Sequence, residues 1–269
     1  MKKILSVLLV ICIACSALFM VSCGNENGNV DNSVSAKDLV KNAVEKTENA
    51  DAVSGKMSLK MSMSIMGMSM EVPMDMDIKI LDAQSEFPKA YIDLSMSMLG
   101  TDMDMSIYTE NGWGYYEYNG ASYKAYIGDE GDEYTSMANN LVEALPDNIL
   151  EGKKVIKNSD GTKSVTVELS KEEFGNIYAD FVKEMYSSLM GTVTDIEDLE
   201  IDDIVLTYTV APSGYLSKYE MSFKMGVNVE GLSTTMTVDS SMDYIEFDPA
   251  KITITPPAGY QDFVETELG

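Results

Sequence analysis

Apolar and polar side chains alternate along much of the chain, beginning at residue 53. In Val53–Ile65 the odd positions are apolar or small, and in Met68–Ile80 the even positions are apolar. Strict alternation predicts half-buried strands, here of about thirteen residues or roughly 40 Å each. Pro73 cannot donate a hydrogen bond to a neighbouring strand, so it predicts an edge or a bulge within the second of these strands.

Further alternating segments follow, and turn sequences separate them. Asn111-Gly112 and Asn119-Gly120 are typical of hairpin turns and bracket an aromatic strand. The segments before residue 128 therefore predict an antiparallel meander of six strands. Beyond the first two, strands are expected at 90–98, 103–107, 113–118, 123–127, 153–157, 162–169, 201–210, 215–229, 232–247 and 251–255.

Three helices are expected among the strands, at 35–49, 132–145 and 171–190. Ser35 precedes an apolar face at helical spacing and can cap the first helix, with Asp38 three residues on. Ser170 and Glu173 form a capping box for the third. No linker or charge break follows residue 35, so residues 35–269 are interpreted as a single domain.

The first 23 residues have the features of an export signal. Lys2 and Lys3 precede an apolar or small-residue run, and Met20-Val21-Ser22 then leads into Cys23. This pattern resembles the lipobox of bacterial lipoproteins. The resemblance implies lipid transfer to the Cys23 thiol, cleavage before Cys23 and a diacylglyceryl anchor, so that 1–22 are a signal peptide and 23–34 a tether. The alternatives are an ordinary signal peptide or an uncleaved membrane helix.

The cysteines agree with this interpretation. Cys12 and Cys15 would leave with the signal peptide, so the mature chain would keep Cys23 alone and form no disulfide. We therefore expect the protein at the cell membrane, lipid-anchored on the extracytoplasmic face. Loss of Lys2 and Lys3 would change the net charge from −25 to −27. An anionic membrane surface would repel a domain of this charge, so we expect the acyl chains to keep it at the membrane.

The composition excludes several classes of protein. All 19 basic residues are lysines and the chain has no histidine, so it lacks the base of a Ser–His–Asp or Cys–His nucleophile and any imidazole metal ligand. A net charge of −25 without arginine argues against nucleic acid. No catalytic motif is found, and the acidic clusters 129–133 and 195–203 lack the spacing of a calcium loop. We therefore expect that the protein is not an enzyme and uses no cofactor, and that these carboxylates form no metal site.

The order of elements is informative when combined with the lipobox, the hairpin at Gly112–Tyr123 and the closing strands at Tyr215–Thr255. This combination resembles the Lol-type lipoprotein carriers and the lipid-binding lipoproteins of mycobacteria, and most of all a group of Met-rich Gram-positive lipoproteins of uncharacterised function. The resemblance implies an α+β, mainly β fold: a curved antiparallel half-barrel of about eleven strands with three helices packed on its concave face. It also implies an apolar cavity for lipid chains. The chain departs from these families in its methionine density and in lacking the arginine inside the Lol carrier's cavity.

A sheet of strands this long has an apolar face that must be covered, and helices of these lengths cover only part of it. We therefore expect a cavity between sheet and helices that binds or carries a hydrophobic ligand, such as a lipid or acyl chain. We also expect the protein to be a monomer. The alternative is a non-catalytic surface or interaction domain whose side chains fill that space. The expected ligand-binding residues are Met61, Met63, Met76, Ile78, Leu94, Met96, Met105, Ile107, Tyr178, Phe181 and Met185.

Methionine is concentrated in one part of the chain, with twelve of the 21 methionines falling within residues 57–105. Core filling is one explanation. A deformable pocket is a second, because the unbranched thioether side chain adapts to ligands of variable shape. A Met-based Cu(I) site is a third, because thioethers are soft ligands and Met-x-Met recurs within the expected strands at 61/63, 68/70, 74/76, 96/98 and 103/105, with both members on one strand face.

Overall fold

The computed structural model describes residues 29–65, 68–98, 100–128, 145, 147–174, 199–229 and 232–266. The predicted signal peptide, Cys23 and the start of the tether lie outside these residues. So do residues 132–144 of the helix predicted at 132–145, and most of the helix predicted at 171–190.

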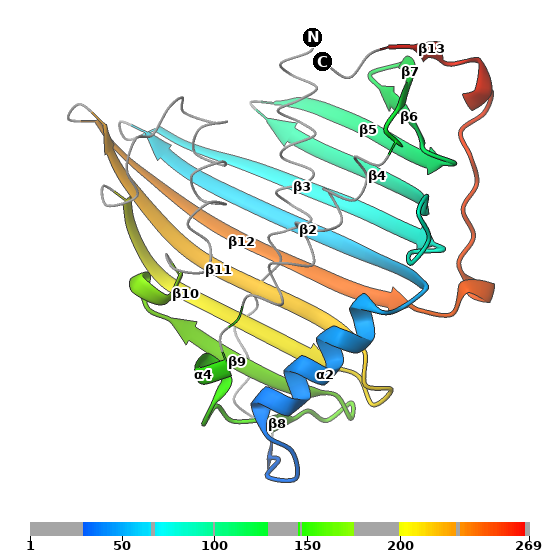
Figure 1. The fold of residues 1–269 in the computed structure, drawn as a ribbon. Coiled ribbons are helices and arrows are strands. Elements are labelled where there is room, and N and C mark those ends of the chain that lie inside the picture. Colours follow the sequence, from blue (N-terminus) through cyan, green and yellow to red (C-terminus); the bar gives the residue numbers. More distant parts are fainter. Residues whose placement is uncertain are drawn as a thin grey trace.

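The described residues form one broad, curved and open sheet of thirteen strands (Figure 1). Its order is β1-β8-β9-β10-β11-β12-β2-β3-β4-β5-β6-β7-β13, and every pair is antiparallel except β13 with β7. The first half is β1 (Asn29–Val30), β8 (Ile156–Lys157), β9 (Lys163–Leu169), β10 (Leu199–Val210), β11 (Leu216–Val229) and β12 (Leu232–Glu246). The second half is β2 (Ala52–Ile65), β3 (Met68–Leu81), β4 (Lys89–Met98), β5 (Thr101–Glu110), β6 (Trp113–Tyr118), β7 (Ala121–Tyr126) and β13 (Val264–Glu265).

The predicted fold class is confirmed: the protein is mainly β, and its curved sheet is open rather than a closed barrel. The six-strand meander is also confirmed as β2–β7. Both Asn-Gly hairpins form, with Asn111 and Asn119 at φ 53° and 48° and each following glycine near 77°. Pro73 lies immediately beyond Met74, where pairing with β4 stops, as expected for a residue without an N–H.

Helix α2 (Ala36–Glu48) forms where the sequence predicted it. The Ser35 side chain accepts a hydrogen bond from the Asp38 N–H, and the helix buries Val40, Ala43 and Val44 against β10 and β11. A short helix, α4 (Asp147–Leu150), packs against α2 and β9. Residues 171–174 begin the predicted third helix, and the Ser170–Glu173 capping box is present, with the Ser170 N–H donating to Glu173 over 2.8 Å. No helix in the described part of the chain is long and apolar enough to cross a membrane.

The predicted strand at 251–255 is wrong. The chain forms a 3-10 turn, η3 (Pro249–Lys251), and then runs without strand pairing through residues 252–257. Pro256 and Pro257 at the end of this segment offer no N–H to a ladder. The segment ends in a second turn, η4 (Tyr260–Asp262), and in the two-residue strand β13 beside β7.

Candidate functional site

The sheet has one strongly apolar face, called here the inner face, on which α2 lies. A row of directly paired residues crosses nine strands on this face, from β9 to β6. Its members are Val165, Tyr208, Tyr219, Met242, Met57, Met76, Leu94, Met105 and Tyr118. All but Tyr118 are at most 4% exposed. We call this the main row.

A second row runs parallel to the first across eight strands. It consists of Val167, Leu206, Met221, Ser240, Leu59, Met74, Met96 and Met103. Apart from the tyrosine hydroxyls, Ser240 carries the one polar side chain in the two rows. No member of either row is charged. The inner face is therefore suited to apolar rather than charged groups.

Methionines meet across the strands as well as along them. Met57 pairs with both Met76 and Met242, and Met96 pairs with both Met74 and Met103. Side chains that are directly opposite on antiparallel strands have Cβ atoms about 5 Å apart, so these thioethers form a continuous layer. Such a layer is deformable because each methionine has three rotatable bonds.

The structure brings the predicted sheet residues together. Met61, Met76, Ile78, Leu94, Met96, Met105 and Ile107 are buried in one hydrophobic cluster, and Met63 packs against it. Tyr178, Phe181 and Met185 lie outside the described residues.

Several inner-face residues were not among the predicted lining residues, because they belong to strands near the C-terminus. The pairing of β12 with β2 places Met242 and Met236 beside Met57 and Met63. Their own alternation was a signal that could have found them, since apolar side chains fall at every second position in the middle of each strand, at Tyr219, Met221, Phe223 and Met225 of β11 and at Met236, Val238 and Met242 of β12 apart from Ser240.

The described helices make their main contacts with one end of this face. Helix α2 packs against β10 and β11, and α4 packs against β9 (Figure 1). The methionine-rich strands β2–β5 form the other half of the sheet, where their inner-face side chains are also buried.

The opposite, outer face is mostly polar, and one aromatic cluster on it is buried. Tyr108 of β5 is completely buried there, because Tyr260 and Tyr115 cover it with ring centroids 5.2 and 5.7 Å away. Burial raises the pKa of Tyr108 to about 12. Glu110 accepts hydrogen bonds from Tyr260 over 3.1 Å and from Lys89 over 3.0 Å, so this cluster holds the C-terminal segment on the sheet. The alternation pattern did not predict it.

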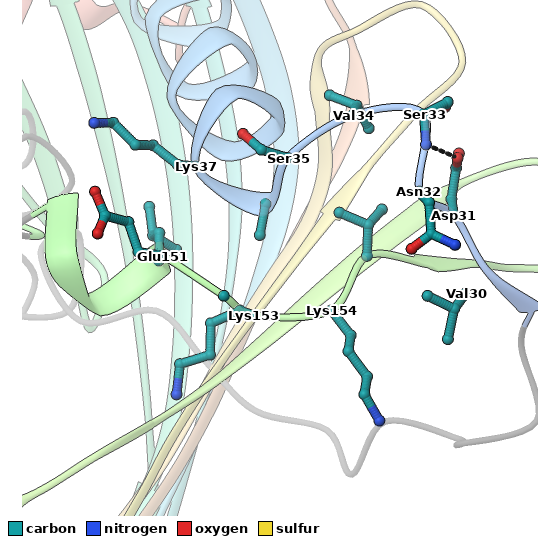
Figure 2. Close-up of a pocket in the computed structure, with 14 residues that line it drawn as sticks. Val30, Asp31, Asn32, Ser33, Val34, Ser35, Lys37, Glu151, Lys153 and Lys154 are labelled. Atoms are coloured by element: carbon teal, nitrogen blue, oxygen red, sulfur yellow. Dashed lines mark hydrogen bonds between the residues drawn. The ribbon is translucent and has the colours of Figure 1, made fainter.

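The described part of the chain has hollows at two places that bear on function. One, of about 480 Å³, lies between β1, the N-terminus of α2 and residues 150–155 (Figure 2). The other, of about 610 Å³, lies on the outer face around Lys56 and is lined by Asp75, Asp77, Asp93, Asp104 and Asp243.

Within the described ranges, no group of three or more His, Cys, Asp or Glu residues is placed to hold a metal ion. The acidic cluster at 129–133 lies outside those ranges, as do residues 195–198 of the cluster at 195–203.

Ion pairs fix the segment that enters the domain at the first hollow. Asp31 contacts Lys163 over 2.8 Å and accepts a hydrogen bond from the Ser33 N–H over 2.8 Å, and these contacts hold the pKa of its carboxyl well below the usual range. Asp147 of α4 contacts both Lys37 and Lys41 of α2, which lowers the pKa of that carboxyl as well. The described part of the predicted tether, from Asn29 on, is thus attached to the domain.

Comparison with known proteins gives a family and several distant structures. The family described as "Family of unknown function (DUF6612)" matches residues 35–257. No curated protein matches the chain. Among solved structures, the chain is similar to LprF from Mycobacterium bovis, with 10% identity over 83% of this chain and 97% of that chain and a TM-score of 0.40.

Two further structures are similar at a lower TM-score. A DUF1329 family protein from Desulfovibrio piger has 9% identity, covers 78% of this chain and 91% of its own, and has a TM-score of 0.26. A LolA superfamily protein from Nitrosomonas europaea has 11% identity, covers 82% of this chain and 99% of its own, and has a TM-score of 0.26. A mycobacterial protein and a LolA superfamily protein are thus among the similar structures, at a distance too great to carry an argument about function.

Proposed function

The chain belongs to the DUF6612 family, whose function is unknown, and we propose that it is an exported lipoprotein that holds a hydrophobic ligand against the inner face. The ligand class is a lipid or an acyl chain. The lipid anchor is Cys23, and the domain lies on the extracytoplasmic side of the cell membrane.

One feature carries the ligand proposal: the main row and the second row form an uncharged layer across at least eight strands. A layer this wide exceeds what α2 and α4 contact, since those helices pack against β9–β11. An acyl chain has the chemistry that this layer accepts, because burying its methylene groups is favourable and requires no polar partner.

Methionine is the side chain that best supports such a role on β2–β5. Its flexible, polarisable thioether adapts to chains of different length and saturation, whereas branched side chains hold a fixed shape. Met57, Met76, Met96 and Met105 all lie on this half of the sheet and are at most 7% exposed.

The same burial favours a second candidate, an interaction domain whose own side chains fill the inner face. Core packing at normal density would also leave Met74 and Met76 nearly unexposed. The cross-strand methionine pairs favour a third, a Cu(I)-binding protein, because thioethers on adjacent strands can reach one soft ion.

Native mass spectrometry of the mature chain with Cys23→Ser separates the three candidates. A co-purifying lipid supports the proposal, bound copper overturns it in favour of the metal site, and bare protein that also takes up no added fatty acid overturns it in favour of the filled core.

A matched pair of variants locates the ligand. Met76→Trp places a large ring at the centre of the main row and should lower the bound-lipid fraction severalfold. Asp75→Trp places the same ring on the exposed outer face of the same strand and should leave that fraction unchanged. Equal occupancy in both variants, with thermal melting confirming that both fold, contradicts binding at the inner face.

The anchor has its own test. Cys23→Ser should abolish incorporation of labelled fatty acid into the protein in cells and should release the chain from the membrane fraction. Persistent labelling of the variant contradicts acylation at Cys23.

A further inference from the structure

Positive charge is concentrated at one place on this acidic protein. Residues 152–157 read Gly-Lys-Lys-Val-Ile-Lys, so three lysines fall within six residues and no acidic residue lies between them. Lys154 and Lys157 are exposed and Lys153 is half-buried. We call residues 152–157 the lysine segment.

The charges of Lys154 and Lys157 are available to an external partner, and Lys153 is close enough to Glu173 of the neighbouring segment to help lower the pKa of that carboxyl. Nearby cations are neutralised within the domain, Lys37 by Asp147 and Lys163 by Asp31. Among the residues that the structure describes, none forms an ion pair with Lys153, Lys154 or Lys157. Figure 2 shows Lys153 and Lys154 extending their amino groups away from the N-terminus of α2.

The lysine segment lies where the chain arrives from the membrane anchor. Strand β1 pairs with β8, so Asn29 lies opposite Lys157, and the Asp31 N–H donates to the Val155 carbonyl over 2.8 Å. Cys23 precedes Asn29 by six residues, and six residues span at most about 22 Å when fully extended. The lysine segment therefore stays within a short distance of any bilayer that holds the Cys23 acyl chains.

The rest of the surface opposes contact with an anionic membrane. The outer-face hollow carries five aspartates around Lys56, and the whole chain has a net charge of −25. An anionic surface attracts lysines within about a Debye length, roughly 8 Å, and repels carboxylates over the same range. Such a charge distribution orients the domain as well as attracting it.

We infer that the lysine segment rests on the anionic phospholipid head groups of the membrane in which Cys23 is anchored, and so fixes which end of the domain faces the bilayer. This inference rests on the proposed lipoprotein anchor. The attraction of a lysine near an anionic surface corresponds to about a fivefold change in binding, so three lysines supply a large bias in orientation.

The test couples the mature chain through Cys23, its one thiol, to a maleimide lipid in vesicles of phosphatidylcholine, with or without roughly one quarter phosphatidylglycerol. Mass spectrometry then follows acetylation of each lysine. Lys153, Lys154 and Lys157 should react about fivefold more slowly on the anionic vesicles, while Lys56 and Lys224 should react equally on both. Salt at about 0.5 M should remove the difference.

Two variants sharpen the result. In the double variant Lys153→Gln with Lys154→Gln, Lys157 should be acetylated at the same rate on anionic vesicles as on neutral vesicles. The matched control, Lys56→Gln with Lys60→Gln, removes two exposed lysines of β2 and should leave the protection of Lys157 intact. Equal rates on the two vesicles, or equal protection of Lys56, overturn the head-group contact.

Failure here is distinct from failure of the proposed function. The coupling to the vesicle is chemical, so the assay needs neither acylation in cells nor a ligand on the inner face. A missing acyl mass on Cys23 in cells overturns the lipoprotein proposal, whatever the vesicles show.

Discussion

Gly55 of β2 lies where another strand approaches very closely. A Cβ atom at this position would be 2.4 Å from the Met242 methyl and 2.8 Å from the backbone oxygen of Asp243. Strand β12 shifts its register between Tyr244 and Glu246, directly beside Gly55. Gly55→Ala should therefore destabilise the sheet at the junction of its two halves.

The magnitude follows from which of the two contacts can move. The Met242 methyl is the end of a flexible side chain and can rotate away, whereas the Asp243 oxygen moves only if β12 moves with it. Overpacking of this kind costs about 1 to 3 kcal/mol of unfolding free energy. In a chain of this length each kcal/mol lowers the melting temperature by about 2 to 4 °C, so Gly55→Ala should lower it by roughly 2 to 12 °C.

Urea unfolding followed by circular dichroism measures the change, with Ser58→Ala as the matched control. Ser58 lies on the same strand with its side chain exposed on the outer face, and its replacement should change the unfolding free energy by less than about 0.5 kcal/mol. If Gly55→Ala unfolds at the wild-type urea concentration, β2 and β12 are not as close as described. The pairing of Met57 with Met242 in the main row would then be refuted with it.

Three further predictions concern the inner face and the two terminal segments. Met76→Ala should lower the unfolding free energy by about 2 to 5 kcal/mol because Met76 is 3% exposed, whereas Met76→Leu should cost less than about 1.5 kcal/mol; urea titration measures both. Lys163→Ala should speed amide hydrogen exchange in residues 29–31, because its contact with Asp31 holds that segment beside β8. Burial raises the pKa of Glu110, but hydrogen bonds from Lys89 and Tyr260 and the nearby Tyr108 hydroxyl outweigh it and leave this pKa lowered. The resulting stabilisation is present above about pH 4.5 and is lost as pH falls through the lowered pKa, so Glu110→Gln should lose less thermal stability than wild type between about pH 7 and 3.

The inner face was predictable from the alternation pattern because the side-chain period of a strand is two. That pattern assigned Met57, Leu59 and Met61 to one face and their neighbours to the other, as the structure has them. It did not predict which strands become neighbours. The pairing of β12 with β2 joins residues about 180 positions apart, and alternation specifies the face of a strand but not its partner. The predicted lining residues of the sheet therefore lay on β2–β5, where they included Met76, Leu94, Met96 and Met105 of the two rows, and they missed the members on the other strands.

The outer-face cluster could not be predicted for a related reason. Tyr108 occupies a position that alternation assigns to the outer, polar face, and its complete burial depends on Tyr260, which lies about 150 residues later. The segment that brings Tyr260 there was predicted to contain a strand at 251–255. Its β-branched residues Ile252, Thr253 and Ile254 favour a strand, but no neighbouring strand is available to pair with them in the described structure. Local propensity was outweighed by the position of the segment in the sheet.

Photo-crosslinking tests the central claim most directly. A fatty acid that carries a diazirine on its chain is bound to the mature protein and irradiated, and the modified peptides are then mapped by mass spectrometry. We predict adducts on the inner-face residues of β2–β5 and β12, above all on Met57, Met76, Leu94 and Met105, with competition by unlabelled fatty acid. Adducts confined to outer-face positions such as Ser58 and Asp75, or labelling that unlabelled fatty acid does not reduce, would contradict a hydrophobic ligand site on the inner face.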